Sequence, residues 1–197
     1  MKENEIVTNS FREHLGVLKD TLEKHADNIV AAADLIFDCY NKGGKVLLFG
    51  NGGSAADSQH IAAEFVGRFL SERRSLPAIA LTTDTSILTA VGNDYGFDRI
   101  FQRQVESLVN SGDVIIALST SGNSENVIEG VLTAREKGAK VIVLSSQGGG
   151  RLHDHADILI DIPSKETPRI QEMHILVGHT ICNIVETVVM SRKEGGK

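Results

Sequence analysis

The chain has 197 residues and a formal net charge of −6. This length is most simply one domain with a substantial core. The acidic balance, without any lysine- or arginine-rich run, argues against a nucleic-acid-binding protein. No run approaches the roughly 18 apolar residues of a membrane span and no apolar leader is present, so we expect a cytoplasmic protein without membrane contact.

Helical periodicity dominates residues 8–42, which we expect to form a pair of helices. An apolar stripe in the first segment includes Leu15 and Leu22, and Asp27 or Asn28 is a suitable cap for the second. Such a pair either covers one face of its own domain or forms an oligomer interface, as many enzymes of this size do. Both alternatives remain open at this point.

Five strand-like apolar runs follow, and helical patterns separate most of them. This alternation predicts an α/β fold, with a five-stranded parallel sheet and helices on both faces. The expected strands are residues 45–50, 77–81, 113–118, 140–145 and 157–162, and the expected helices are residues 54–70, 97–110, 124–137 and 168–191.

Two short loops rich in glycine and serine each join an apolar strand to a helical pattern. The first is Gly50-Asn51-Gly52-Gly53-Ser54 and the second is Ser119-Thr120-Ser121-Gly122-Asn123-Ser124. Free N–H groups and the positive end of the helix dipole make such a loop an anion site, and the hydroxyls of the second loop add donors. Since the carboxyl ends of parallel strands meet at one edge, we expect both loops to face one pocket. Two such loops indicate a phosphorylated small molecule.

A nicotinamide cofactor is a less favoured alternative. The first loop satisfies the GxGxxA pattern through Gly50, Gly52 and Ala55, which alone is a weak signal. Asp84 would then bind the ribose, but its spacing from the loop is longer than the usual ~20 residues. The second loop has no role in that scheme.

Two polar side chains on the predicted helix 54–70 form a candidate metal site. His60 and Glu64 are four residues apart and therefore share one helix face, where an imidazole and a carboxylate can bind one divalent cation such as zinc. A helix-surface ion pair is the simpler alternative. The last predicted helix holds Gln171, Glu172, His174 and His179 on an apolar background. Such polar groups need partners, and a core histidine with satisfied hydrogen bonds is the default expectation for either histidine alone.

The segment Val91–Phe97 is rich in turn-forming residues, so we expect a loop between the second and third strands. Placed on the binding edge of the sheet, Asn93 and Asp94 would contact sugar hydroxyls.

Taken together, these stretches resemble the SIS (sugar isomerase) domain family and, within it, the phosphoheptose isomerases. The resemblance implies a single SIS domain over residues 1–197, a three-layer sandwich, and a homotetramer with helices at its centre. It is carried in order by Gly44–Val46, Gly50–Ser54, His60-x-x-x-Glu64, Pro77–Leu81, Val91–Phe97, Gly112–Val114, Ser119–Ser124, and Arg169-Ile170-Gln171-Glu172-x-His174 with His179.

The resemblance also implies roles for individual residues. Glu64 and His179 match the catalytic acid/base pair. The metal ligands, usually for zinc, would be His60, Glu64, Gln171 and His179. The substrate contacts would be Asn51, Gly52, Gly53, Glu64, Asn93, Asp94, Ser119, Thr120, Ser121, Ser124 and Gln171. Pro168 departs from the family, in which many members have an acidic residue, so the resemblance implies no substrate contact from that position.

The implied activity is aldose–ketose isomerisation of sedoheptulose 7-phosphate to D-glycero-D-manno-heptose 7-phosphate through an enediol. The product would serve heptose synthesis for a lipopolysaccharide core or another surface glycan. The alternative is a non-catalytic SIS module that binds a phosphosugar or the replication initiator protein. Glu64 and His179, the residues that typically separate the two, are both present and favour the enzyme.

The spacing on the last helix leads to one further expectation. Gln171 and His179 are eight residues apart, about 12 Å along an unbroken helix. Metal bonds to nitrogen or oxygen are only about 2.0–2.2 Å long. We therefore expect different subunits to supply Gln171 and His179, which makes the active site a subunit-interface site in which Glu64 and His179 also come from different subunits.

Overall fold

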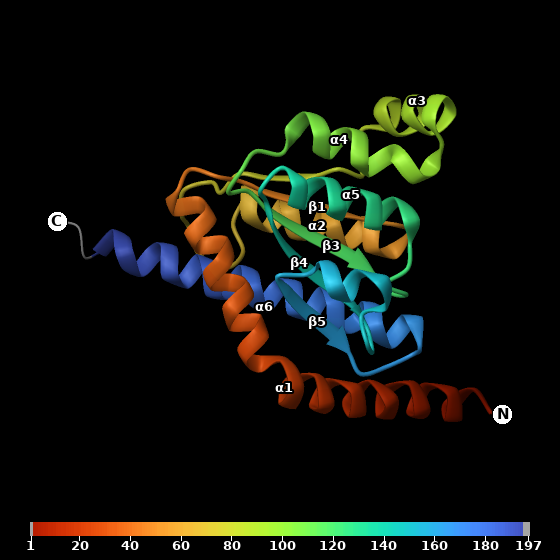
Figure 1. Ribbon diagram of the computed structural model, residues 1–197. Coiled ribbons are helices and arrows are strands. Elements are labelled where there is room, and N and C mark those ends of the chain that lie inside the picture. The colour runs from red at the N-terminus through yellow and green to blue at the C-terminus, as the bar shows by residue number, and fades with distance from the viewer. Residues whose placement is uncertain (1, 195–197) are drawn as a thin grey trace.

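The computed structural model describes the backbone of residues 2–194 and the side chains of residues 2–191. At its centre lies a five-stranded parallel sheet with the order β2-β1-β3-β4-β5 (Figure 1). The strands are β1 (Val46–Gly50), β2 (Ala78–Ala80), β3 (Val114–Ser119), β4 (Lys140–Ser146) and β5 (Ile158–Ile162). Each agrees with a predicted run to within one residue at either end, so the predicted sheet is confirmed.

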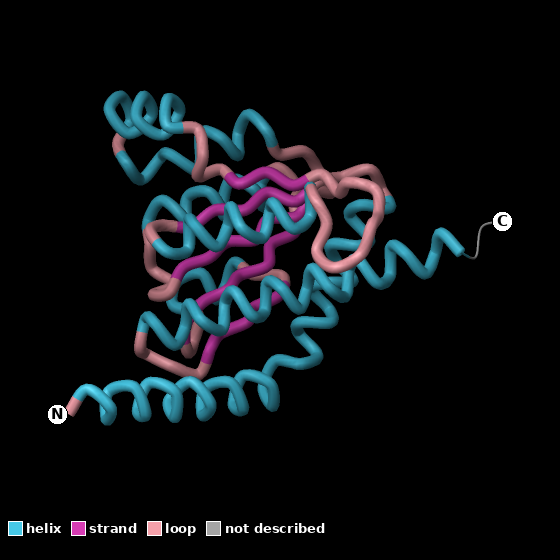
Figure 2. Tube along the Cα trace, turned by 180° about the vertical axis from the view of Figure 1, so that it is seen from behind, coloured by secondary structure: helices cyan, strands magenta, loops and turns pink. Residues whose placement is uncertain are grey.

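Different helices cover the two faces of the sheet. Successive side chains of a strand point to opposite faces, so each strand contributes to two separate core clusters. Leu48 and Ile116 pack in one core cluster, and their neighbours Leu47 and Ile115 pack in the other. The first cluster is shared with α1 (Glu3–Asn41), α2 (Gly53–Val66) and α6 (Thr167–Glu194), and the second with α4 (Ile100–Leu108) and α5 (Glu125–Glu136). The result is the expected three-layer α/β sandwich (Figure 2).

The predicted N-terminal pair of helices is wrong in one respect, because α1 is a single helix that changes direction along its length (Figure 1). Asn28 does not cap a second helix; instead its Nδ2 donates a hydrogen bond to the carbonyl of Leu159 at 3.0 Å. Lys24 Nζ also lies 2.7 Å from the Asp161 carboxylate. These polar side chains therefore bind α1 to β5, while the helix continues.

The segment predicted as a loop after the second strand is a helix, α3 (Thr85–Tyr95), followed by the short 3₁₀ helix η1 (Phe97–Arg99). Asp84 starts α3, since its Oδ1 accepts a hydrogen bond from the Ile87 N–H at 2.9 Å. Leu88 and Val91 then pack against the core cluster of α4 and α5. Capping and packing therefore outweigh the turn preferences of the sequence.

The helix α6 is long and apolar enough to cross a membrane by length and composition alone. However, half of that stretch is buried inside the protein, and Val177, Ile181 and Val185 belong to the core. This is the pattern of a core helix in a folded domain.

The chain reverses its direction of progress across the sheet between β1 and β3. From β1 it passes to the edge strand β2 and then returns to the other side of β1 as β3. Such a switch point forms a crevice at the carboxyl ends of the strands, where ligands bind in open α/β sheets. The two predicted loops follow β1 and β3, on either side of this point.

Candidate functional site

The two glycine- and serine-rich loops lie side by side, as predicted. Gly50 at the end of β1 pairs with Leu118 of β3, so Asn51 and Ser119 begin neighbouring loops. Asn51 and the buried Asn126 of α5 exchange two amide hydrogen bonds, of 2.8 and 2.9 Å. This pair of side chains fixes the first loop to α5, the helix that follows the second loop.

Two hydroxyls of the second loop face each other at the N-terminus of α5. Ser119 is buried, and its Oγ lies 3.2 Å from that of Ser124, the N-cap residue. The segment after β4 supports the loop from behind: Leu152 N–H donates to the Gly122 carbonyl at 3.1 Å, and Arg151 N–H donates to the Asn123 side chain at 3.0 Å. Hydroxyls at a helix N-terminus suit an anionic group such as phosphate.

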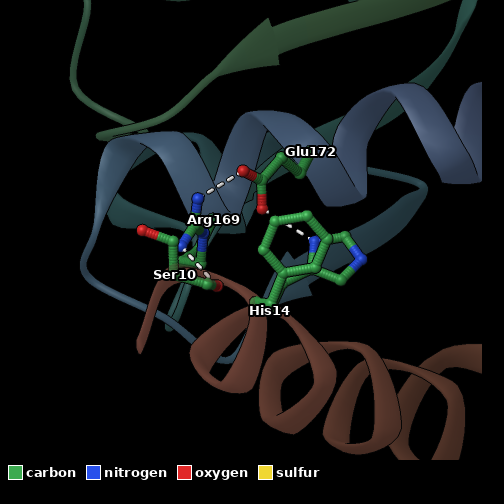
Figure 3. Close-up of a pocket in the computed structure, with 5 residues that line it drawn as sticks. Ser10, His14, Arg169 and Glu172 are labelled. Atoms are coloured by element: carbon green, nitrogen blue, oxygen red, sulfur yellow. Dashed lines mark hydrogen bonds and ion pairs between the residues drawn. The ribbon is translucent and has the colours of Figure 1, made fainter. Parts of the chain in front are cut away.

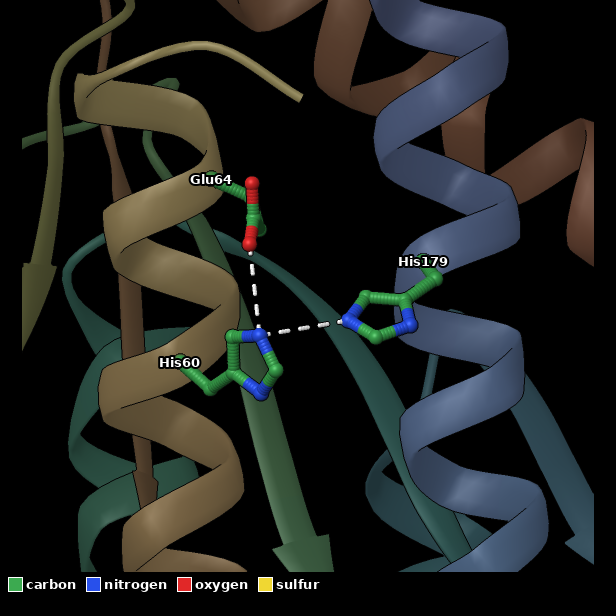
Figure 4. A group of neighbouring side chains, drawn as sticks. All are labelled: His60, Glu64 and His179. Atoms are coloured by element: carbon green, nitrogen blue, oxygen red, sulfur yellow. Dashed lines mark hydrogen bonds and ion pairs between the residues drawn. The ribbon is translucent and has the colours of Figure 1, made fainter. Parts of the chain in front are cut away.

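Three of the four predicted metal ligands converge between α2 and α6 (Figure 4). His60 Nε2 lies 3.2 Å from Glu64 Oε1 and 3.4 Å from His179 Nε2. The ligand atoms of all three residues lie within 4.8 Å of one another. Two imidazole nitrogens and a carboxylate oxygen facing one small space match the donors that zinc prefers, so this chemistry fits the implied metal.

The expectation that Glu64 and His179 come from different subunits is wrong, because one chain brings them together. The helices α2 and α6 lie alongside each other: a Cβ on Gly178 would be 2.5 Å from Ile61 Cδ1, and one on Gly53 would be 2.5 Å from Gln171 Nε2. Glu64 therefore needs to reach only the neighbouring helix. The fourth predicted ligand, Gln171 of α6, has its side chain against Gly53 at the start of α2. Gly53 is about 10 Å from His60 along the axis of α2.

Asn93 and Asp94 lie on α3 rather than in a loop, both exposed, with Asn93 Nδ2 donating to Asp94 Oδ1 at 2.8 Å. A cavity of about 160 Å³ lies between the first loop and α3. Gly50, Asn51, Gly52, Ala55, Thr82, Leu88, Phe97, Ile100 and Phe101 line it. The structure thus places a hollow against the first loop, but the two polar side chains do not line it.

Two side chains near the triad of His60, Glu64 and His179 were not identified from the sequence. Asp57 lies one turn before His60, and burial raises its pKa, although His60 and His179 act in the opposite direction. Phe69, in the segment after α2, has its ring 5.4 Å from that of His179. The spacing of three residues between Asp57 and His60 was a readable signal. Nothing in the sequence pattern marked Phe69.

The other polar side chains at the start of α6 have structural partners. Glu172 contacts Arg169 and lies 2.8 Å from His14 Nδ1, while Arg169 Nη1 donates to the Ser10 carbonyl at 2.8 Å (Figure 3). Burial raises the pKa of Glu172, but Arg169 and His14 outweigh it and hold the value below its usual range. These contacts bind α6 to α1 beside a cavity of about 270 Å³.

His174 is a core histidine, as its apolar surroundings suggested, although its Nδ1 is buried without a hydrogen-bond partner among the described residues. It is fully buried, its Nε2 lies 3.1 Å from the Ser145 carbonyl, and burial lowers its pKa to about 4. The imidazole is therefore neutral at physiological pH and takes no part in the triad.

Comparison with known proteins defines the class first: the SIS domain family model matches residues 11–146. The phosphoheptose isomerase of Aquifex aeolicus is 56% identical over 188 residues, which cover 95% of this chain and 98% of the relative. Two solved phosphoheptose isomerase structures are also similar. The structure from Neisseria gonorrhoeae is 44% identical with a TM-score of 0.90, and the match covers 94% of this chain and 100% of that one. The structure from Francisella tularensis is 37% identical with a TM-score of 0.92, and the match covers 95% of this chain and 100% of that one. Within the SIS domain family, the chain belongs to the phosphoheptose isomerases.

Proposed function

We propose that this protein is an aldose–ketose isomerase that converts sedoheptulose 7-phosphate to D-glycero-D-manno-heptose 7-phosphate. The observation that carries the proposal is the close approach of Glu64 on α2 to His179 on α6. The reaction requires an acid/base pair and a group that holds the substrate phosphate, and the helix that carries Glu64 begins at the first loop. The similarity to phosphoheptose isomerases supports the same substrate.

The second loop orients the substrate by its phosphate. Ser119, Thr120, Ser121 and Ser124 hold this group, and Asn51, Gly52, Gly53, Asn93, Asp94 and Gln171 contact the sugar. Binding energy at the phosphate end thereby positions the reacting carbons. Glu64 moves the proton between C1 and C2, and His179 transfers protons at the oxygens of the enediol.

The proposal includes a zinc ion held by the triad. Bound by His60, Glu64 and His179, zinc would supply Lewis-acid stabilisation of the negative oxygen that develops in the reaction. Gln171 as a fourth ligand stays a prediction, since its side chain lies against Gly53.

We further infer a single-domain, cytoplasmic protein that forms a homotetramer and makes heptose for a surface glycan such as a lipopolysaccharide core. An exposed apolar face on the first half of α1 supports association, since Phe11, Leu15 and Leu22 are 71%, 61% and 64% exposed. The similarity to isomerases disfavours the alternative of a non-catalytic module.

The test is incubation of the purified protein with sedoheptulose 7-phosphate in D₂O. Proton abstraction predicts an aldose product that carries deuterium on carbon, both of which NMR detects. Glu64→Gln should abolish product and label. Glu72→Gln, the same change at a side chain that is 91% exposed, should have no effect. A wild-type protein without product would favour the binding module, and an active Glu64→Gln variant would remove Glu64 from the chemistry.

A further inference from the structure

A buried ion pair lies behind the triad, where α2 ends. Arg73 Nε and Glu186 Oε1 are 3.1 Å apart, and the two side chains are 1% and 3% exposed. The proposed reaction uses neither residue. A buried ion pair is weak support for stability, because the cost of removing two charges from water often exceeds their attraction. Its contacts show what the pair holds in place.

Glu186, on α6, binds the segment that follows α2. Its carboxylate accepts hydrogen bonds from three successive backbone N–H groups, those of Phe69, Leu70 and Ser71, at 2.9, 2.8 and 2.8 Å. Burial raises the pKa of Glu186, but these bonds and Arg73 outweigh it and hold the value below its usual range. The carboxylate is therefore ionised at neutral pH and fixes the backbone of this segment.

Arg73 binds the end of α2 itself. The last carbonyls of a helix have no partner within the helix, and an arginine side chain can satisfy them. Arg73 Nη2 donates to the carbonyl of Glu64 at 2.6 Å, and Nη1 donates to those of Phe65 and Gly67 at 2.9 and 3.2 Å. The guanidinium thus holds the backbone of the residue to which the proton transfer is assigned.

The same segment returns to the other side of the triad. Phe69, whose N–H is bound by Glu186, places its ring 5.4 Å from the ring of His179. Glu186 lies seven residues after His179 on α6, about 10 Å along the axis. The ion pair therefore connects the backbone of Glu64 with the ring packed against His179.

We propose that Arg73 and Glu186 are positioning residues that set the distance between Glu64 and His179 across α2 and α6. The proposal rests on the isomerase function above and goes beyond it by assigning a role to two residues that do not touch the substrate. Residues behind metal ligands act in this way, and replacing one typically weakens metal binding 10- to 100-fold.

The test replaces the carboxylate with an amide of the same size. In Glu186→Gln, an NH₂ group faces backbone N–H donors and the charge of Arg73 loses its partner. We expect Zn²⁺ affinity, measured by competition with a chromophoric chelator, to fall about 10-fold or more. We also expect kcat to fall about 10-fold or more, while KM changes less than about threefold because the phosphate loop lies on β3 and α5.

Asp113→Asn is the matched control. Asp113 is also a buried carboxylate that accepts two backbone N–H bonds, from Lys45 and Asn110 at 3.0 and 2.8 Å, and pairs with Lys45 Nζ at 2.7 Å. It precedes β3, and its carboxylate contacts Lys45 and Asn110 rather than α2, the segment after α2 or α6. This variant should lose stability but keep zinc affinity and kcat within about twofold. Arg73→Lys, which keeps the charge but loses the fork of donors, serves if Glu186→Gln does not fold.

The outcomes separate the two proposals. The positioning role is overturned if Glu186→Gln, or Arg73→Lys in its place, changes zinc affinity and kcat no more than Asp113→Asn does. Wild-type protein that binds zinc but leaves sedoheptulose 7-phosphate unchanged overturns the isomerase alone, and the zinc titrations then decide the positioning role. If wild-type protein is active but binds no zinc, the comparison of kcat between Glu186→Gln and Asp113→Asn decides the positioning role. Wild-type protein with neither overturns both.

Discussion

Polar side chains on α6 divide into those with partners elsewhere in the fold and those directed at α2. Glu172 contacts Arg169 and His14, and His174 contacts Ser145. His179 instead faces His60 and Glu64. His60, Glu64 and His179 pair with one another at a partly exposed position, and two imidazole nitrogens and a carboxylate oxygen that face one space suit a metal ion. This contrast distinguishes the site from the structural polar groups around it.

The metal assignment predicts that protein purified without a chelator contains close to one zinc per chain. His60→Ala removes one of three donors and should lower the zinc content strongly, as measured by atomic emission. His153→Ala is the control, because His153 is exposed and paired with Asp154 on the surface. Full activity in protein shown to be metal-free would reduce the triad to acid/base residues.

The phosphate assignment predicts a change in KM. Ser119→Ala or Ser124→Ala removes a hydroxyl from the second loop, and each lost hydrogen bond to a charged group costs about 1.5–3 kcal/mol. We expect KM for the sugar phosphate to rise about 10-fold or more, with a smaller change in kcat. Ser107→Ala, at an exposed position on α4, should leave KM unchanged. An unchanged KM in the double variant would place the phosphate elsewhere.

Burial of His174 predicts a dependence of stability on pH. Its pKa falls from 6.5 to about 4 on folding, so below pH 6.5 the unfolded chain binds a proton that the folded chain excludes. The free energy of unfolding should therefore fall between pH 7 and pH 5, by about 2 kcal/mol from this group. Urea titrations of wild type and His174→Gln at both pH values measure it. The same pH dependence in both proteins would contradict the prediction.

At the scale of elements, the site depends on how closely α2 and α6 approach. Gly178 permits this approach, since a Cβ there would lie 2.5 and 2.8 Å from two carbons of Ile61. Gly178→Ala should therefore destabilise the protein by about 1–3 kcal/mol, despite the better helix propensity of alanine. Gly92→Ala on α3, whose nearest neighbour would be 3.9 Å away, is the control and should not destabilise. Equal melting temperatures for wild type and Gly178→Ala would contradict the close packing.

The strands were predictable from the sequence because each is a short apolar run bounded by turn residues. The helix α3 was not, because Asn93, Asp94 and Gly96 favour turns, whereas the packing of Leu88 and Val91 involves residues distant in sequence. In the site, the i,i+4 pair of His60 and Glu64 was visible from spacing alone. The contribution of His179 from the same chain was not, since spacing along α6 contains no information about which helix lies beside it.

At the scale of the whole molecule, the exposed face of α1 leads to a prediction about assembly. Phe11, Leu15 and Leu22 lie on one side of the helix, and burying a side chain of this size contributes about 1.5–3 kcal/mol. We expect wild type to be a tetramer by light scattering and the double variant Leu15→Glu, Leu22→Glu to dissociate. Asp20 projects from the opposite side of the helix, so Asp20→Lys should leave the tetramer intact. A tetrameric double variant would place the interface elsewhere.

The same variant tests whether the metal site is complete within one chain. His60, Glu64 and His179 belong to one protomer, and their ligand atoms already lie within 4.8 Å of one another. The dissociated protein should therefore bind zinc with an affinity close to that of wild type, measured by the same chelator competition. A loss of zinc that accompanies dissociation, in protein that remains folded by circular dichroism, would show that a neighbouring subunit supplies or positions a ligand.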